Sequence, residues 1–129
     1  MPRFLSTLLL TVLLALATSA TAQDLVGSYF AFIGRDDLYN SKGQRLTEPW
    51  QILRQDRANY HRFGIWQVGD EGDNFFGSID NRAIMERMVM NGKIDSFAGQ
   101  RIVAGGVKVH VQIYGYGNRG DFVQVTVSD

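Results

Sequence analysis

The stretch Val107-Lys-Val-His-Val-Gln-Ile-Tyr-Gly-Tyr-Gly-Asn-Arg-Gly-Asp-Phe-Val-Gln-Val-Thr-Val127 contains two runs in which every second residue is hydrophobic. A period of two places alternate side chains on one face of a strand, and the glycines between the runs are typical of a turn. The stretch therefore predicts a β-hairpin over residues 107–127 with one face in the core. The core-facing residues are Val107, Val109, Val111 and Ile113 in the first run, and Val123, Val125 and Val127 in the second.

The shared face also fixes the register of this hairpin. Both hydrophobic sets face the core only if directly opposed residues have the same parity, as in Ile113 opposite Val123. The turn must then hold an odd number of residues, such as Gly117-Asn118-Arg119, or the hairpin must contain a bulge. On the other face, the register pairs Tyr114 with Phe122 and His110 with Thr126.

The remainder of the chain supplies a third strand and several helices. Residues 25–33 are aromatic, β-branched and nearly continuously apolar, which predicts a buried strand. Helical patterns cover residues 47–61, with Thr47 as a cap, residues 78–91, with Ser78 as a cap, and residues 95–105. Residues 63–68 read as a short strand. These elements predict an α+β domain: an antiparallel sheet of three or more strands with two or three helices packed on one face.

Two loops complete the expected fold. Residues 35–44 are polar and contain a turn signal, and residues 70–77 form an acidic loop that returns Phe75 and Phe76 to the core. The helix over residues 78–91 has a second hydrophobic patch at Ile79, Ala83 and Met90, which predicts burial on two sides.

The first 22 residues have the composition of a secretory signal peptide. Arg3 precedes an apolar run, Leu8 to Ala17, that is too short to cross a bilayer, and Ala20-Thr-Ala22 fits a cleavage site. We expect cleavage after Ala22, a periplasmic or secreted protein, and no membrane association after cleavage. The remaining residues, 23–129, are enough for a single small domain.

Composition limits the classes of partner. The exported part carries 12 basic and 13 acidic groups, so it lacks the excess of positive charge that is typical of nucleic-acid-binding proteins. No cysteine is present, so the domain must be stabilised by packing rather than by disulfides.

The side chains with the most chemical capability gather around His61. Histidine exchanges protons near neutral pH, and in a helix Asp56, Arg57 and Tyr60 lie within one turn of it or beside it. Asp56, Tyr60 and His61 are the candidates for acid-base catalysis. The candidate ligand-binding residues are Asp56, Arg57, Tyr60, His61 and Arg62. The alternative is that these residues form ordinary surface pairs around a partly buried histidine.

The acidic loop offers a candidate metal site. Asp70, Glu71, Asp73 and Asn74 supply the hard oxygen ligands that calcium prefers, although their spacing does not match an EF-hand. The alternative is a solvated turn. His61 together with these carboxylates is a second candidate ligand set, for zinc or another transition metal, although the sequence contains no H-x-x-x-H or H-E-x-x-H pair.

The outer face of the hairpin is a possible recognition surface. If that face is exposed, an aromatic patch results, composed of Tyr114, Tyr116, Phe122, Trp66 and His110. Alternatively, the loops of residues 35–76 cover it.

We therefore expect an exported, non-catalytic binding or accessory domain whose ligand is a protein, a carbohydrate or a small molecule. The alternatives are a small secreted hydrolase that uses His61 as general acid or base, and a calcium-stabilised structural module. No motif of a known family decides among them.

Overall fold

The computed structural model describes residues 23–128, so the predicted signal peptide lies outside the described residues. The chain folds into one antiparallel sheet with strand order β1-β2-β3, and the predicted α+β class is confirmed. The strands are β1 (Asp24–Phe32), β2 (Lys108–Tyr116) and β3 (Arg119–Ser128). The helices are η1 (Arg35–Leu38), α1 (Pro49–Ala58), η2 (Asn59–Phe63), α2 (Ile79–Ala83), α3 (Met85–Asn91) and α4 (Ser96–Ala104).

The hairpin has the predicted register. Ile113 lies opposite Val123, Tyr114 opposite Phe122, and His110 opposite Thr126. Of the two solutions for the turn, the structure uses the bulge: the pairing shifts after Tyr114, so that Gly115 lies opposite Gly120. The inward valines and isoleucine are consequently buried, apart from the half-buried Val127 near the chain end.

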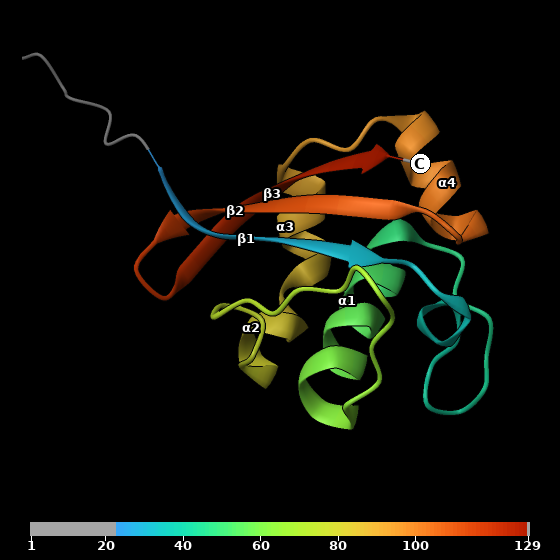
Figure 1. The fold of residues 1–129 in the computed structure, drawn as a ribbon. Coiled ribbons are helices and arrows are strands. Elements are labelled where there is room, and N and C mark those ends of the chain that lie inside the picture. Colours follow the sequence, from blue (N-terminus) through green and yellow to red (C-terminus); the bar gives the residue numbers. More distant parts are fainter. Residues whose placement is uncertain (1–22, 129) are drawn as a thin grey trace, which may run out of the picture.

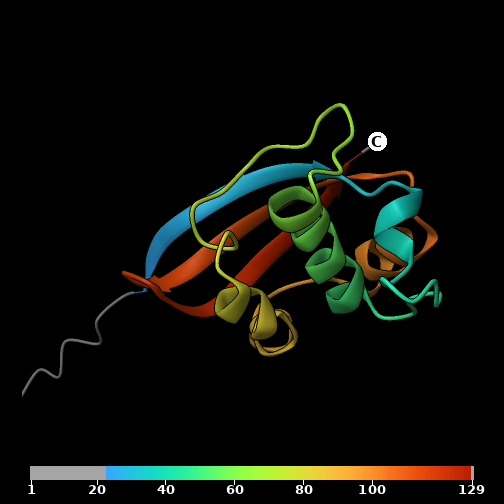
Figure 2. The ribbon, with the colours of Figure 1, turned by 90° about the horizontal axis from the view of Figure 1, so that it is seen from below.

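The helices cover one face of the sheet, with the core between the two layers (Figures 1 and 2). α1 contributes Ile52 and Leu53 to this core, and α3 contributes Met85 and Met88, all of them fully buried. Phe75 and Phe76 return from the acidic loop to the core, as predicted.

The segment after α1 differs from the prediction. The helix begins one residue later than expected, with Glu48 rather than Thr47 at the cap. It then continues as one π-helical turn, η2, which Gly64 ends in the left-handed conformation. The predicted strand over residues 63–68 is wrong, because residues 59–63 are still helical and residues 64–67 form no ladder.

The helix predicted over residues 78–91 is divided. Ser78 caps it as expected, but the backbone leaves the helical region at Ile84, which separates α2 from α3. The prediction of burial on two sides is wrong, since Ile79 and Met90 are exposed. Gly92 ends α3 where the chain passes against β3, and a Cβ at that position would overlap the backbone oxygen of Val123.

Short segments pair with both free edges of the sheet. At the β3 edge, the Lys93 N–H donates to the Val123 oxygen and the Lys93 oxygen accepts from the Val125 N–H. At the β1 edge, the Asp70 carboxylate accepts from the Phe32 N–H at 2.8 Å, and the Glu71 carboxylate accepts from the Phe30 N–H at 2.9 Å. Unpaired edges promote aggregation, so these contacts protect the sheet.

No helix of the described residues covers the outer face of the sheet (Figure 2). Its aromatic side chains pair across the strands: Tyr114 stacks on Phe122 at 4.9 Å, and His110 stacks on Phe30 at 4.3 Å between ring centroids. Trp66 packs instead beside Tyr60. Of the predicted patch, Tyr114, Phe122 and His110 therefore lie in two stacked pairs, the second of which includes Phe30. The 64–77 loop meets the sheet at the β1 edge.

Of the two carboxylates at the β1 edge, that of Asp70 is expected to make a measurable contribution to stability. Asp70→Ala leaves the N–H groups of Phe32 and Gln67 without their acceptor, and we expect it to lower the free energy of unfolding by about 1 to 3 kcal/mol. The matched control is Glu86→Ala, which removes an exposed carboxylate from α3 and should cost less than about 0.5 kcal/mol. Urea unfolding measures both. Equal midpoints for the two variants would contradict the proposed edge contact.

Candidate functional site

The most unusual feature of the interior is a fully buried arginine. The Arg57 guanidinium projects from α1, donates from Nε to Asp56 Oδ2 at 2.9 Å and donates from Nη1 to Asp73 Oδ1 at 2.9 Å. Nη1 also donates to the backbone oxygen of Glu71 at 2.9 Å. A buried charge is tolerated only with such partners, because water is not available to solvate it. This ion cluster joins α1 to the acidic loop.

Two tyrosine rings lie beside the guanidinium. The Arg57 Cζ atom is 3.8 Å from the Tyr29 ring centroid and 4.9 Å from that of Tyr60. The negative faces of aromatic rings attract cations. Tyr29 belongs to β1 and Tyr60 to η2, so the guanidinium connects the sheet to the π-helical turn. The Arg57 Nη2 and Tyr29 Oη atoms are buried without a hydrogen-bond partner in the described part of the chain.

Asp73 connects the ion cluster to His61. Its Oδ1 atom lies 2.8 Å from His61 Nε2, and its Oδ2 atom accepts the backbone N–H groups of Phe75 and Phe76. Burial alone would raise the pKa of Asp73, but the hydrogen bonds from Phe76, His61 and Arg57 outweigh this and hold it below its ordinary value. Since Asp73 is ionised, Nε2 of His61 carries the proton of their hydrogen bond. The imidazole is thus held in one tautomer and one orientation.

The pKa values of the buried acids Asp56 and Asp37 are shifted in the opposite direction from that of Asp73. Burial raises the pKa of Asp56 above its ordinary value, although the Arg57 guanidinium opposes the shift. Burial also raises the pKa of Asp37 to about 6, against the hydrogen bonds from Asn59 and Gly34. Asp73 is therefore the acid that carries the negative charge beside Arg57 most firmly.

A second buried contact fixes η2 to the rest of the domain. Asn59 Nδ2 donates to Asp37 Oδ1 at 2.9 Å, and Asn59 Oδ1 accepts from Gln55 Nε2 at 2.9 Å. The backbone oxygen of Asn59 also accepts the N–H of Ile65. The π-helical turn that carries Tyr60 and His61 is therefore tied to η1 and to the following loop. Turns of this kind occur frequently at functional sites.

A depression of about 420 Å³ lies in front of His61, which we call the His61 depression. Its lining comes from the β1 edge, from η2 and from the acidic loop, namely Val26, Gly27, Ser28, Tyr60, His61, Gly72, Asp73 and Asn74. The His61 side chain is 14% exposed and that of Asp73 is 1% exposed, so His61 meets solvent above a buried carboxylate. Gly72 passes so close to Tyr60 that a Cβ there would lie 3.0 Å from the hydroxyl oxygen.

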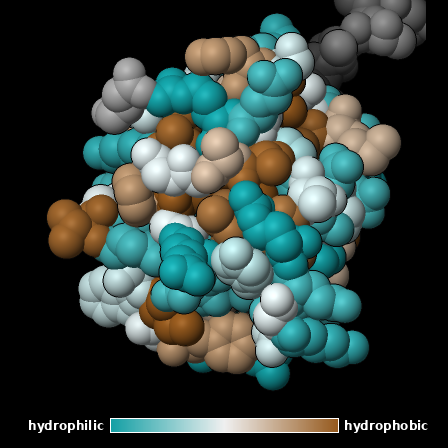
Figure 3. All heavy atoms as spheres, turned by 90° about the vertical axis from the view of Figure 1, so that its right-hand side faces the viewer, coloured by the Kyte–Doolittle hydropathy of each residue, from teal (hydrophilic) through white to brown (hydrophobic). Residues whose placement is uncertain are grey.

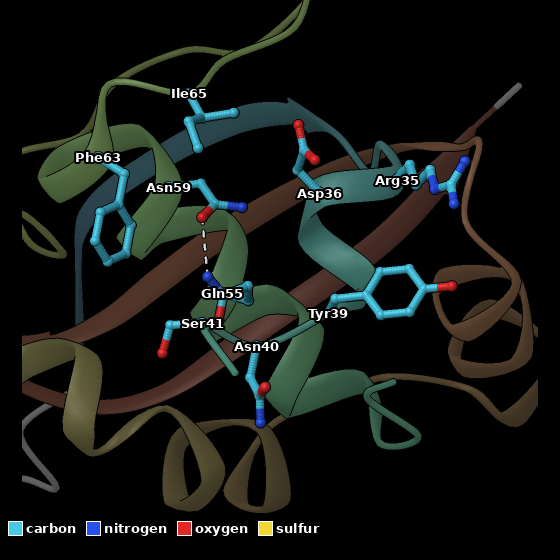
Figure 4. Close-up of a pocket in the computed structure, with 9 residues that line it drawn as sticks. All are labelled: Arg35, Asp36, Tyr39, Asn40, Ser41, Gln55, Asn59, Phe63 and Ile65. Carbon is cyan, nitrogen blue, oxygen red and sulfur yellow. Dashed lines mark hydrogen bonds between the residues drawn. The ribbon is translucent and has the colours of Figure 1, made fainter. Parts of the chain in front are cut away.

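Two other hollows are lined by residues of α1 and η2. A groove of about 410 Å³ runs between η1 and the end of α1, where Gln55 and Asn59 hydrogen-bond to each other while Tyr39 and Phe63 stand at its sides (Figure 4). A smaller depression of about 240 Å³ includes Arg62. On the side of the molecule that carries α4, hydrophobic and hydrophilic residues are intermixed, without a broad hydrophobic area (Figure 3).

The acidic loop uses most of its oxygens internally. Asp70 and Glu71 accept from the backbone of β1, and Asp73 accepts from Arg57, His61 and two backbone N–H groups. Asn74 lies at the His61 depression. Within residues 23–128, no three histidine or acidic side chains are placed together to hold a metal ion.

The structure brings only part of the predicted site to one surface. Tyr60 and His61 line the His61 depression, Arg62 faces a different one, and Asp56 and Arg57 lie beneath the surface. Asp73, considered in the sequence only as a metal ligand, is the partner of His61. Tyr29, Asp37 and Asn59 were missed, because their separate positions in the predicted strand, loop and helix gave no signal of convergence. The predicted loop at Asp37 is in fact the 3-10 helix η1.

Comparisons with protein-family models, with curated proteins and with solved structures found no match to this chain. The residues and their geometry are therefore the basis for any functional conclusion.

The ion cluster predicts a pH-dependent effect of Asp73→Asn. The folded pKa of Asp73 is lowered, so its ionised form contributes stability above about pH 4, and this contribution is lost as the pH falls through the folded pKa. At pH 7 the variant leaves Arg57 without one of its charge partners, and we expect a loss of about 3 to 5 kcal/mol in the free energy of unfolding.

Urea unfolding of the wild type and the variant between pH 7 and pH 3 measures this loss. The difference in the free energy of unfolding between the wild type and the variant should become smaller toward pH 3. The exposed acid Asp36, replaced by Asn, is the control and should show a small difference throughout. If Asp73→Asn lowers the free energy of unfolding by the same amount at every pH, Asp73 is not an ionised partner of Arg57 in the folded state.

Proposed function

We propose that this protein is an exported, non-catalytic binding domain whose ligand occupies the His61 depression. The observation that carries the proposal is the convergence there of Tyr60, His61 and Asn74 with the edge of β1. Ligand sites are concave and hold a few polar groups in fixed positions. This depression has that character, with elements from three separate parts of the chain.

The buried ion cluster supports binding by fixing these groups in advance. His61 is held by Asp73, Asp73 by Arg57, and the Arg57 guanidinium lies over the ring of Tyr60. Side chains that are already ordered lose little conformational entropy when a ligand binds, which increases affinity. The candidate residues Asp56 and Arg57 would then act on the ligand indirectly, by holding Tyr60 and His61 in place.

A non-catalytic role fits the surroundings of the imidazole better than acid-base catalysis does. The hydrogen bond to Asp73 uses Nε2, and the Nδ1 edge of the ring lies toward Gly77, where a Cβ would be 3.7 Å away. Within the described part of the chain, no hydroxyl group is hydrogen-bonded to His61 as an activated nucleophile would be.

Export is part of the same proposal. The leader-like residues 1–22 support delivery to the periplasm or the extracellular medium. Within residues 23–128, none of the helices has the length and hydrophobicity needed to cross a bilayer.

The proposal is tested by mapping ligand contacts with amide chemical shifts while the protein is titrated with a library of small polar fragments. We expect the shift changes to concentrate at Tyr60, His61 and Gly72 to Asn74. Tyr60→Ala should weaken the bound fragments by about tenfold or more, because it removes a wall of the depression. The control Tyr39→Ala removes a tyrosine from the neighbouring groove and should leave these affinities unchanged.

Thermal unfolding of both variants confirms that each is folded before affinities are compared. Fragments that bind in the groove of Tyr39 and not beside His61 would contradict the proposal, as would a library without a binder at the His61 depression.

A further inference from the structure

The His61 depression includes a stretch of strand edge whose backbone groups are unpaired. In an antiparallel strand, the N–H and C=O groups of successive residues point alternately to the two neighbours. Both Phe30 groups point away from β2, because the Phe30 N–H donates to Glu71 and the Phe30 oxygen accepts the Glu71 N–H. Phe32 donates on the same side, to Asp70. By the same alternation, the N–H and C=O of Ser28 also point to this outer edge.

The acidic loop occupies the edge as far as Glu71 and then leaves it. The Asp70 and Glu71 carboxylates accept the N–H groups of Phe32 and Phe30, and the Glu71 N–H donates to the Phe30 oxygen. The loop therefore runs antiparallel to β1 through two side-chain hydrogen bonds and one backbone hydrogen bond. In a regular antiparallel ladder that paired Glu71 with Phe30, Asp73 would lie beside Ser28. Asp73 instead turns into the core to reach Arg57 and His61. Among residues 23–128, no group bonds to the outward backbone of Ser28.

Space for another strand is present at this point. Val26, Gly27 and Ser28 of β1 line the depression together with Tyr60 and His61 of η2 and residues 72–74 of the acidic loop. The bulge in β1 between Leu25 and Gly27 interrupts the regular ladder immediately beyond Ser28. A chain lying along this edge would meet a free donor and a free acceptor on β1 and polar side chains of η2 on its other flank.

We infer that the ligand of the His61 depression is an extended segment of polypeptide, which adds to the edge of β1 at Ser28 and continues the line of the acidic loop. This inference rests on the proposed function, because it names the class of ligand for the same depression. Main-chain hydrogen bonds supply affinity in this mode of recognition, and alternate side chains of the peptide supply specificity. Those side chains point toward Tyr60 and His61 on one face and toward the outer face of the sheet on the other.

The experiment uses a displayed library of random linear peptides of about ten residues, the length of one strand, selected against the protein. The deciding variant is Ser28→Pro. It removes the outward N–H of residue 28 without removing a ladder bond, and proline is tolerated at such edge positions. We expect selected peptides to bind this variant at least about tenfold more weakly, the effect of one lost backbone hydrogen bond that leaves its partner unpaired.

The matched control is Ser28→Ala, which keeps the N–H and removes only the hydroxyl group. It should bind the selected peptides like the wild type. Thermal unfolding checks both variants. If Ser28→Pro does not fold, hydrogen exchange of the Ser28 amide in the wild type decides instead: bound peptide should slow that exchange at least about tenfold, as expected for an amide that gains a backbone acceptor.

The outcomes separate this inference from the proposed function. Peptides that lose affinity with Tyr60→Ala but not with Ser28→Pro would keep the depression as the binding site and overturn strand addition. Peptides that respond to neither variant would overturn both. A library that yields no binder would overturn the polypeptide inference and leave the fragment experiment as the measure of the proposed function. Self-association that Ser28→Pro abolishes would identify the occupant as a second copy of this chain and overturn a separate peptide.

Discussion

A buried guanidinium requires acceptors and negative charge, and the structure around Arg57 is arranged to provide both. Asp56 lies next to it in the same helix, whereas Asp73 and the Glu71 carbonyl come from a loop more than a dozen residues further along. The loop must enter the domain at Asp73 for the charge to be accommodated. Breaking such a buried pair costs far more than an exposed salt bridge contributes, so this contact constrains the path of the whole loop.

The shape of the surface follows from that path. Before Asp73, the loop lies along β1 and closes its edge through Asp70 and Glu71. At Asp73 it turns inward, brings His61 into a fixed orientation and leaves the edge open beside Ser28. One ion cluster thereby protects part of the sheet edge and defines a depression next to the rest. The proposed binding of an extended peptide requires that the acidic loop closes the β1 edge at Phe30 and Phe32 and leaves it open at Ser28.

The sequence predicted the sheet well and the site only partly. The valine alternation in residues 107–127 depends on a single buried face, so it determined the register and the need for an odd loop or a bulge. The region around His61 was identified because its residue types are chemically capable. Its geometry could not be predicted, since the π-helical turn and the inward path of Asp73 depend on contacts between distant residues. The predicted strand over residues 63–68 failed for the same reason: apolar residues there follow a helix that tertiary contacts prolong.

The protonation of the His61 ring tests the central role of the ion cluster most directly. Nitrogen NMR of the imidazole at neutral pH distinguishes which ring nitrogen carries hydrogen. If Arg57 keeps Asp73 ionised beside His61, Nε2 carries the proton and its signal is retained, because the hydrogen bond protects it from exchange. A neutral ring with its proton on Nδ1, or an Nε2 proton in free exchange with water, would contradict the account.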